Sequence, residues 1–527
     1  MKSLRFAIAP AALALSLAAQ GLNPALLLKA PTDAWPTYNG DYSGRRYSTL
    51  AQIDSSNVKN LGLAWVFRAN TGSGNPFGTE VKSTPLEVNG VLYFTAPDHA
   101  WAIDARTGRE LWHFKWESAG GIHIGNRGVG IYGNWLYFET PDCHLVSLNL
   151  KDGKQRWATE ICDLQQHYFG SVAPVVIRNH VIVGVSGDDL DVPGYLESRD
   201  PETGQLQWRW YTEPKPGEPG SETWPNQEAM AHGGGMTWIP GTYDPELNLY
   251  YLGTGNPQPV LAGKGRGGDD LYTESIVALN PDTGKMAWYF QPSPHDTHDW
   301  DAVQTPILFD GEFNGSRRKL IGQASRNGYF FVLDRTNGEH LLTKPFIETN
   351  WASEIDKRGR PMRDLKKDPA PDGVLVSPSS DGAANWPPPS YNPDTGLFYV
   401  SARKAYSVFY LTDTADKPEG WGGVDKGLWS ECSLRAIDYK TGQLRWIRNW
   451  GTADDSLSGL LSTAGHLLFT GDTSGNFMAL NAASGDTLWH VNLNANVANG
   501  PMSYELDGTQ YLVVGAGDSL YAFKLPR

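Results

Sequence analysis

The densest group of chemically capable side chains is the stretch from His295 to Asp301, which reads His-Asp-Thr-His-Asp-Trp-Asp. It places three carboxylates and two imidazoles within seven residues. Carboxylates this close repel one another unless a cation or a general-base role compensates. His295 and His298 have a spacing that zinc accepts, but no third ligand follows at a defined spacing. The stretch therefore indicates general-base or cation chemistry, with a zinc site and a plain polar loop as alternatives.

Three further stretches lie next to strand-like runs and carry oxygen or guanidinium groups. Ser186-Gly187-Asp188-Asp189 offers side-chain oxygens and a backbone nest, and Asn256 in Gly-Thr-Gly-Asn-Pro offers an amide oxygen that suits Ca²⁺. Arg326, in Ser-Arg-Asn-Gly, brings a guanidinium that can meet an anionic oxygen. A simple turn explains each stretch taken singly. Only their combination on one fold is specific.

An internal repeat predicts the elements that position these stretches. The unit is a short strand ending in Asp or Asn, a turn with Gly, and a second strand whose fourth residue after the Gly is Trp. Seven copies end at Trp112, Trp157, Trp208, Trp288, Trp446, Trp489 and, in a weaker form, Leu342. Asp or Asn can bond the turn amides and Gly accepts a positive φ, so each copy predicts a β-hairpin. We expect the Trp rings to fill the space between adjacent sheets, as in a β-propeller.

An eighth copy is divided between the two ends of the sequence. Ser519–Leu525 resembles the first strand of the unit, and Leu61–Trp65 resembles the second. Joining them predicts an all-β, eight-bladed β-propeller whose ring is closed by N- and C-terminal strands, without a free edge. Long inserts after Trp208 and after Leu342 are expected to build the functional face. We predict a single domain over residues 35–527.

The beginning of the sequence predicts export. Lys2 and Arg5 precede the apolar run Phe6–Ala19, so residues 1–19 resemble a signal peptide. The run is shorter than the roughly 20 residues that a membrane span needs. We therefore expect an exported, soluble, periplasmic protein without a transmembrane span. The net charge of −14, without a Lys/Arg run, argues against nucleic acid as a partner.

The cysteines limit the cofactors that the sequence can hold. There are three, Cys143, Cys162 and Cys432, which excludes a four-cysteine zinc site, an iron–sulfur cluster and, without Cys-x-x-Cys-His, covalent c-type haem on this sequence. Cys143 and Cys162 lie equally far from the middle of the turn Lys151–Lys154, so they face each other if the register is regular. An oxidising compartment allows a disulfide there, but most cross-strand pairs do not have the required geometry. The sequence leaves this bond open.

From Trp35 to the C-terminus the chain resembles the pyrroloquinoline quinone (PQQ)-dependent dehydrogenases, quinoproteins related to methanol dehydrogenase and the membrane glucose dehydrogenases. WPTYNGDYSGRRYSTLAQIDSSNVKNLGLAW is similar to the family's opening segment, and the repeat units are similar to its blade motif. The resemblance implies oxidation of an alcohol, polyol or sugar hydroxyl to the carbonyl, with PQQ and Ca²⁺ as cofactors. It also implies an external electron acceptor, either a cytochrome c or a quinone.

The resemblance implies a role for each site residue. Asp301 corresponds to the catalytic base, and Arg326 to the residue beside the reactive quinone oxygens. Asp189, Asn256 and Asp301 correspond to the metal ligands. The residues implied to contact PQQ are Glu80, His123, Arg127, Ser171, Ser186, Gly187, Trp238 and Arg326.

Several positions depart from the family's pattern. Gly121-Ile122 replaces a pair of adjacent cysteines, and we expect His123 to face the cofactor instead. Glu80 lies two residues before the family's glutamate, whose aligned place Lys82 takes. Val303 stands where lanthanide-using relatives carry an extra carboxylate, so Ca²⁺ is expected. Asp189 replaces a longer Glu, and Leu457 replaces a Trp over the pocket. These changes bear on the substrate more than on the cofactor.

Two other classes of function remain as alternatives. A non-catalytic periplasmic propeller scaffold would share the blade repeat, but it has no need for Asn256, Asp301 and Arg326 together. A propeller hydrolase using Asp296, Asp299 and Asp301 would leave Arg127 and Trp238 unexplained.

Overall fold

The computed structural model describes residues 21–72, 80–187, 190–452, 457–472 and 474–526. The predicted signal peptide, residues 1–19, lies outside these ranges. Strands form nearly all of the regular structure in the described part, and α1 (Gln227–Ala231) is its single α-helix. No described helix combines the length and apolar character that a membrane crossing requires. The prediction of an all-β protein is confirmed.

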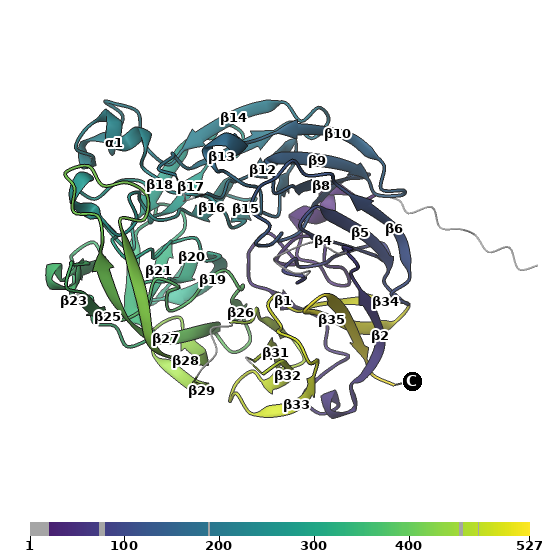
Figure 1. The fold of residues 1–527 in the computed structure, drawn as a ribbon. Helices are drawn as coiled ribbons and strands as arrows, with labels where there is room; N and C mark the ends of the chain where they lie inside the picture. The colour runs from purple at the N-terminus through teal and green to yellow at the C-terminus, as the bar shows by residue number, and fades with distance from the viewer. Residues whose placement is uncertain (1–20, 73–79, 188–189, 453–456, 473, 527) are drawn as a thin grey trace, which may run out of the picture.

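Most strands of the described ranges belong to eight sheets of four or five strands, arranged around a common axis (Figure 1). The first four sheets comprise β3 (Leu86–Val88), β4 (Val91–Ala96), β5 (His99–Asp104) and β6 (Glu110–Lys115); β7 (Gly130–Tyr132), β8 (Trp135–Glu139), β9 (His144–Asn149) and β10 (Gln155–Glu160); β11 (Val175–Ile177), β12 (His180–Val183), β13 (Tyr195–Arg199) and β14 (Leu206–Tyr211); and β15 (Thr242–Asp244), β16 (Leu249–Gly253), β17 (Ile276–Leu279) and β18 (Met286–Phe290). Within each of them, consecutive strands pair antiparallel.

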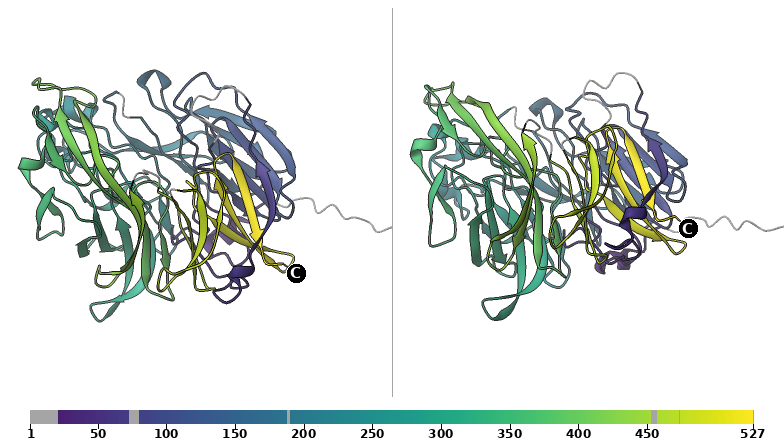
Figure 2. Two further views of the ribbon diagram at one scale, coloured as in Figure 1. Left: turned by 60° about the horizontal axis from the view of Figure 1, so that its bottom comes forward. Right: turned by 90° about the horizontal axis from the view of Figure 1, so that it is seen from below.

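The next sheet repeats this plan, and the two after it have five strands each. They comprise β19 (Ile307–Phe313), β20 (Ser316–Ala324), β21 (Tyr329–Asp334) and β22 (His340–Pro345); β25 (Val374–Val376), β26 (Ser390–Asn392), β27 (Leu397–Leu411), β28 (Gly423–Asp438) and β29 (Leu444–Thr452); and β1 (Tyr47–Ser48), β30 (Leu461–Thr463), β31 (Leu467–Gly471), β32 (Asn476–Asn481) and β33 (Thr487–Asn492). A separate hairpin, β23 (Ala352–Ile355) and β24 (Pro361–Arg363), lies in the insert after Leu342. The long strands β27 and β28 extend beyond their neighbours toward one face (Figure 2).

The eighth sheet joins strands from both ends of the described chain. β2 (Gly62–Arg68) pairs antiparallel with β36 (Ser519–Lys524), which pairs with β35 (Thr509–Ala516) and then β34 (Met502–Leu506). The predicted pairing of Leu61–Trp65 with Ser519–Leu525 is thereby confirmed for the strand residues.

The repeat tryptophans lie between neighbouring sheets, as predicted. A Cβ atom on Gly153 (φ +68°), in the turn between β9 and β10, would lie 2.7 Å from the ring of Trp112 on β6. Trp112 Nε1 also donates to the carbonyl oxygen of Leu150 at 2.8 Å. The same close approach joins Trp65 to Gly108, Trp157 to Gly204, Trp208 to Gly284, Trp288 to Gly338 and Trp446 to Gly485. The turn glycine therefore serves two purposes, because it accepts positive φ and leaves room for the ring.

A β-bulge beside each repeat Trp shifts the hairpin register. Gln155 pairs with Leu148 but Trp157 pairs with Ser147, so Cys143 lies opposite Ile161, whose N–H donates to the Cys143 carbonyl at 2.8 Å. The predicted regular register is therefore wrong by one residue. Cys143, at φ +70°, nevertheless forms a disulfide with Cys162, with their Cα atoms 5.0 Å apart.

Residues 33–48, which precede β2 and end with β1, cross the inner strands and are called here the N-terminal strap. Its hydrogen bonds reach seven of the eight sheets. The contacts are Asp33 with Glu505, Trp35 with Glu87, Tyr42 with Val176 and Tyr243, Ser43 with Leu308, Arg45 with Tyr391, and Arg46 with Ser462. The guanidinium of Arg46, wholly buried, donates to the carbonyl oxygens of Tyr38 (2.7 Å), Leu460 (2.9 Å) and Pro501 (2.7 Å).

The contact between Trp112 and Gly153 predicts the effect of one methyl group. Gly153→Ala forces the new Cβ against the Trp112 ring, and overpacking of this kind costs roughly 1–3 kcal/mol. Gly508→Ala is the matched control, because Gly508 has a similar φ of +72° but no atom within 4 Å of the new Cβ. We expect a lower urea midpoint for Gly153→Ala than for Gly508→Ala. Equal midpoints would show that the Trp112 contact adds nothing to the free-energy cost of placing an alanine at a positive φ.

Candidate active site

Seven of the predicted site residues lie at one end of four consecutive sheets. Arg127, Ser171, Trp238 and Asp301 precede the first strands β7, β11, β15 and β19, whereas Ser186, Asn256 and Arg326 follow the second strands β12, β16 and β20. In an antiparallel pair, the start of one strand and the end of the next lie at the same edge. The repeat itself therefore gathers these side chains.

Asp301 is the centre of a hydrogen-bonded group that joins four predicted residues. Arg326 Nη1 donates to Asp301 Oδ2 at 2.5 Å, and Trp238 Nε1 donates to the same oxygen at 3.1 Å. The backbone N–H of Asn256 donates to Asp301 Oδ1 at 2.7 Å. Burial raises the pKa of the Asp301 carboxyl, and the charge of Arg326 opposes this rise. Both oxygens of Asp301 are therefore held in fixed directions.

Arg326 also binds a second carboxylate. Its Nη2 donates to Asp299 Oδ2 at 3.0 Å and to the carbonyl oxygen of Ser380 at 2.5 Å. Burial alone would lower the pKa of Arg326, but Asp299 and Asp301 raise it above its ordinary value. The sequence places Asp299 only two residues from Asp301, and the resemblance assigns it no role. The structure brings it to the same guanidinium.

A further carboxylate next to this group was missed by sequence reasoning. Glu274 is fully buried, and neither of its carboxylate oxygens has a hydrogen-bond partner among the described residues. Burial raises its pKa well above the ordinary value, and the nearby charges of Asp296 and Asp301 act in the same direction. Buried carboxylates are costly unless a proton or a cation neutralises them. The surplus of carboxylates around Arg326 suits a bound cation, with the side-chain oxygen of Asn256 as a hard ligand.

Arg127 lies in surroundings that suit an anion. Its Nη1 donates to Ser171 Oγ at 2.7 Å, and Ser171 Oγ lies 2.8 Å from Ser186 Oγ. The guanidinium carbon lies 4.7 Å from the centroid of the Trp238 ring and 5.7 Å from that of Trp386. Burial lowers the pKa of Arg127 to about 10. A buried cation held by hydroxyls and aromatic faces can bind a carboxylate of a planar ligand.

The remaining predicted residues have the following positions. Gly187 has φ +139°, and a Cβ there would lie 2.8 Å from the carbonyl oxygen of His167. His123 hydrogen-bonds Asp98 Oδ2 through Nε2 at 2.6 Å. Glu80 accepts from Asn496 Nδ2 at 3.2 Å and lies 3.7 Å from Lys82 Nζ. Among the described residues, neither His123 nor Glu80 has a hydrogen bond to the Asp301 or Arg127 groups.

Asp189 and its neighbour Asp188 lie outside the described residues. Among the residues that are described, no group of three or more His, Cys, Asp or Glu side chains has the arrangement of a metal centre. The three-ligand set of Asp189, Asn256 and Asp301 therefore stays a prediction.

Trp386 and Glu139 were also missed from the sequence. Trp386 lies in the Pro-rich insert, and its only signal was an aromatic residue on the expected functional face. Glu139 is the last residue of β8 and belongs to no sequence motif. It is fully buried, its Oε2 accepts from the N–H of Val172 at 2.8 Å, and burial raises its pKa to about 8.

The raised pKa of Glu139 predicts a pH-dependent stability. The unfolded chain loses this proton near pH 4.5 and the folded protein near pH 8, so the free energy of unfolding falls as the pH rises between these values. One pKa unit corresponds to about 1.4 kcal/mol. We expect Glu139→Gln to make the urea midpoint less dependent on pH from 5 to 8. Exposed Glu110→Gln serves as the control, and parallel pH profiles for all three proteins would contradict the expectation.

Comparisons with known proteins identify the family of this chain. Residues 35–354 and 425–512 match the family described as "PQQ: Glucose/ethanol/alcohol dehydrogenase, beta-propeller domain". The quinoprotein alcohol dehydrogenase PedH of Pseudomonas putida is 37% identical, over 90% of this chain and 84% of that protein. A quinohemoprotein alcohol dehydrogenase of Comamonas testosteroni is 36% identical, over 93% of this chain and 73% of that protein.

Solved structures show the same likeness. The crystal structure of the Comamonas testosteroni quinohemoprotein alcohol dehydrogenase has a TM-score of 0.88 and 32% identity, covering 96% of this chain and 83% of that one. A structure described as a europium-containing methanol dehydrogenase has a TM-score of 0.86 and 28% identity, covering 95% of this chain and 100% of that one. The chain belongs to the PQQ-dependent glucose/ethanol/alcohol dehydrogenase family, in its β-propeller domain.

Proposed function

We propose that this protein is a PQQ-dependent dehydrogenase that oxidises an alcohol, polyol or sugar hydroxyl to the carbonyl and passes the electrons to an external acceptor. The observation that carries the proposal is the group of Asp301, Arg326, Trp238 and Asn256, which combines a carboxylate, a guanidinium and an indole in hydrogen-bond contact. The names of the relatives, which are quinoprotein and quinohemoprotein alcohol dehydrogenases, support it.

The eight four- and five-stranded sheets are proposed to be eight blades of one closed ring, formed by a single domain over residues 35–527. The pairing of β2 with β36 and the Trp–Gly contacts between sheets support this arrangement. We propose that residues 1–19 direct export to the periplasm, where a cytochrome c or a quinone accepts the electrons.

PQQ is proposed to bind between Arg127 and Arg326. Its carboxylates suit Arg127, Ser171 and Ser186, and its ring system suits the face of Trp238. Glu80, His123 and Gly187 complete the proposed contacts. When bound, PQQ supplies a two-electron acceptor that the chain itself lacks.

Asp301 is proposed as the base that takes the hydroxyl proton of the substrate. Its Oδ2 is oriented by Arg326 and Trp238, and burial raises the pKa of its carboxyl, which strengthens it as a proton acceptor. Arg326 carries the compensating charge while the proton moves. Asp299, on the second nitrogen of Arg326, orients that guanidinium.

The cation is proposed to be Ca²⁺, held by Asp189, Asn256 and Asp301, with Lewis-acid polarisation of an oxygen as the chemistry that it supplies. A trivalent lanthanide is the second candidate. The surplus of carboxylates around Arg326 favours it, as does the likeness to a europium-containing methanol dehydrogenase.

Reconstitution tests both the activity and the cation. Apo-protein mixed with PQQ and Ca²⁺ is expected to show the absorbance of bound quinone and to reduce an added dye when an alcohol is supplied. Parallel samples receive La³⁺ or a chelator, and the chelator is expected to abolish dye reduction. Absence of quinone binding under all conditions would favour a non-catalytic scaffold. Higher activity with La³⁺ than with Ca²⁺ would assign the site to a trivalent ion.

Two nearly isosteric substitutions test the base. Asp301→Asn removes the proposed proton acceptor, so turnover at saturating PQQ and cation is expected to fall roughly 10²–10⁴-fold. Asp299→Asn keeps Asp301 and is expected to cost less, because it changes only the orientation of Arg326. The measurement is kcat for each variant with PQQ occupancy checked by absorbance. A larger loss in Asp299→Asn would transfer the role of base to Asp299.

A further inference from the structure

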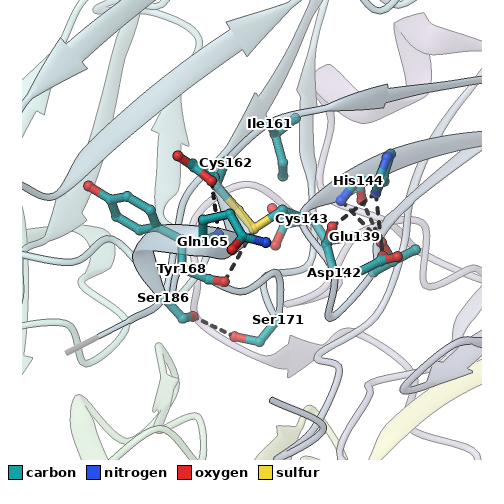
Figure 3. The surroundings of a disulfide bond; sticks show 12 residues. Glu139, Asp142, Cys143, His144, Ile161, Cys162, Gln165, Tyr168, Ser171 and Ser186 are labelled. Atoms are coloured by element: carbon teal, nitrogen blue, oxygen red, sulfur yellow. Dashed lines mark hydrogen bonds and ion pairs between the residues drawn. A yellow bond between two sulfur atoms is a disulfide. The ribbon is translucent and has the colours of Figure 1, made fainter. Parts of the chain in front are cut away.

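The disulfide between Cys143 and Cys162 lies beside the residues proposed to hold PQQ (Figure 3). Cys162 follows β10, and the chain then runs through the 3-10 helix η3 (Leu164–Gln166) to Ser171. These residues, 162–171, are called here the return segment. The Cys143 sulfur lies 3.3 Å from the carbonyl oxygen of Tyr168, in the middle of the return segment. The disulfide therefore contacts the return segment as well as joining its first residue to the turn before β9.

The return segment supports the neighbouring stretch Ser186–Gly187. Phe169 and Ser186 exchange two backbone hydrogen bonds, at 2.9 and 3.1 Å. The two hydroxyls of Ser171 and Ser186 lie 2.8 Å apart. Gly187 approaches the carbonyl of His167 so closely that a Cβ would lie 2.8 Å from it. A displacement of the return segment would therefore move both serines and Gly187 together.

The other end of the disulfide is anchored to a second part of the proposed pocket. Cys143 lies in a turn with Asp142, whose carboxylate accepts from Trp116 Nε1 at 2.9 Å and from the N–H of Ala119 at 2.9 Å. The segment that begins with these residues leads to His123 and Arg127. The disulfide thus links the Asp142 turn, which supports the stretch that leads to Arg127, to the return segment, which carries Ser171.

The fold of this sheet does not depend on the disulfide alone. β9 and β10 pair along their whole length, and the N–H of Ile161 donates to the carbonyl of Cys143 beyond the last pair. Both sulfurs and Tyr168 belong to a buried apolar cluster with Val183 and Val185. Loss of the bond is therefore expected to act on the return segment more than on the sheet.

We propose that the Cys143–Cys162 disulfide is a positioning element of the cofactor pocket, and that its oxidation state sets how tightly PQQ is retained. The inference rests on the proposed PQQ-dependent function. Reduction by dithiothreitol breaks only the S–S bond, transfers two electrons and two protons to the sulfurs, and leaves two thiols and oxidised dithiothreitol. The return segment then loses its covalent link to the Asp142 turn, and Ser171, Ser186 and Gly187 lose a common support.

The test measures PQQ affinity by quenching of tryptophan fluorescence in the full-length protein with Ca²⁺. We expect Cys143→Ser/Cys162→Ser to bind PQQ about tenfold more weakly than the unsubstituted protein, a change of about 1.4 kcal/mol. Its kcat at saturating PQQ is expected to match that of the unsubstituted protein. Cys432→Ser is the matched control, because Cys432 is buried in β28 of a different sheet. This variant is expected to retain the affinity of the unsubstituted protein.

Reduction of the folded protein provides the second measurement. Protein reduced with dithiothreitol, and freed of it before PQQ is added so that the quinone is not itself reduced, is expected to bind PQQ more weakly for the unsubstituted protein and Cys432→Ser, but not for the double variant. The reduction experiment with the unsubstituted protein and Cys432→Ser still tests the inference if the double variant does not fold. Equal PQQ affinity with and without the disulfide would overturn the inference. Hydrogen exchange that increases in every sheet, and not specifically in residues 162–171, would also overturn the inference. The bond would then stabilise the whole fold and not the pocket. Absence of PQQ binding by the unsubstituted, oxidised protein would instead contradict the proposed function.

Discussion

The N-terminal strap is the constraint on which the rest of the structure depends, and the buried guanidinium of Arg46 is its main anchor. Arg46 donates to carbonyl oxygens before β30 and β34 and to one within the strap, without a carboxylate partner among these contacts. Burial lowers its pKa to about 10, so the group remains charged at neutral pH. Hydrogen bonds to a charged donor contribute more than neutral ones. Because the strap bonds seven sheets, it fixes their positions relative to one another.

The proposed site needs this fixed arrangement, because its residues come from different sheets. Asp301 precedes β19, Trp238 precedes β15 and Arg127 precedes β7. Trp238 bonds Asp301 of the next sheet and Arg127 bonds Ser171 of the next sheet, while Asp301 is held both by Arg326 of its own sheet and by Trp238. A small rotation of one sheet would therefore separate the guanidinium of Arg127 from the indole of Trp238.

Much of the fold could be predicted from the sequence, because its determinants are local and repeated. Each Trp–Gly contact is encoded by residues of one turn and one strand, as for Trp112 and Gly153. The register that places Cys143 opposite Ile161 could not be predicted, since it is set jointly by the turn, which aligns Gln155 with Leu148, and by the bulge before Trp157. In the site, the resemblance supplied Asp301 and Arg326. Glu274 and Trp386 have no motif, and only long-range packing brings them to the site.

The eighth sheet has a consequence for how the molecule is assembled over time. Gly62 pairs with Lys524, and the strap residue Asp33 binds Glu505, so the earliest described strands find their partners among the last. Contacts between residues so far apart in sequence slow folding, because the intervening chain must be ordered before they form. Seven sheets can form in order along the chain, but the eighth must await the final strand. Until then, the faces of β3–β6 and β30–β33 that the eighth sheet later covers stay exposed. Exposed apolar faces make the unfinished chain prone to misassembly and to binding by chaperones.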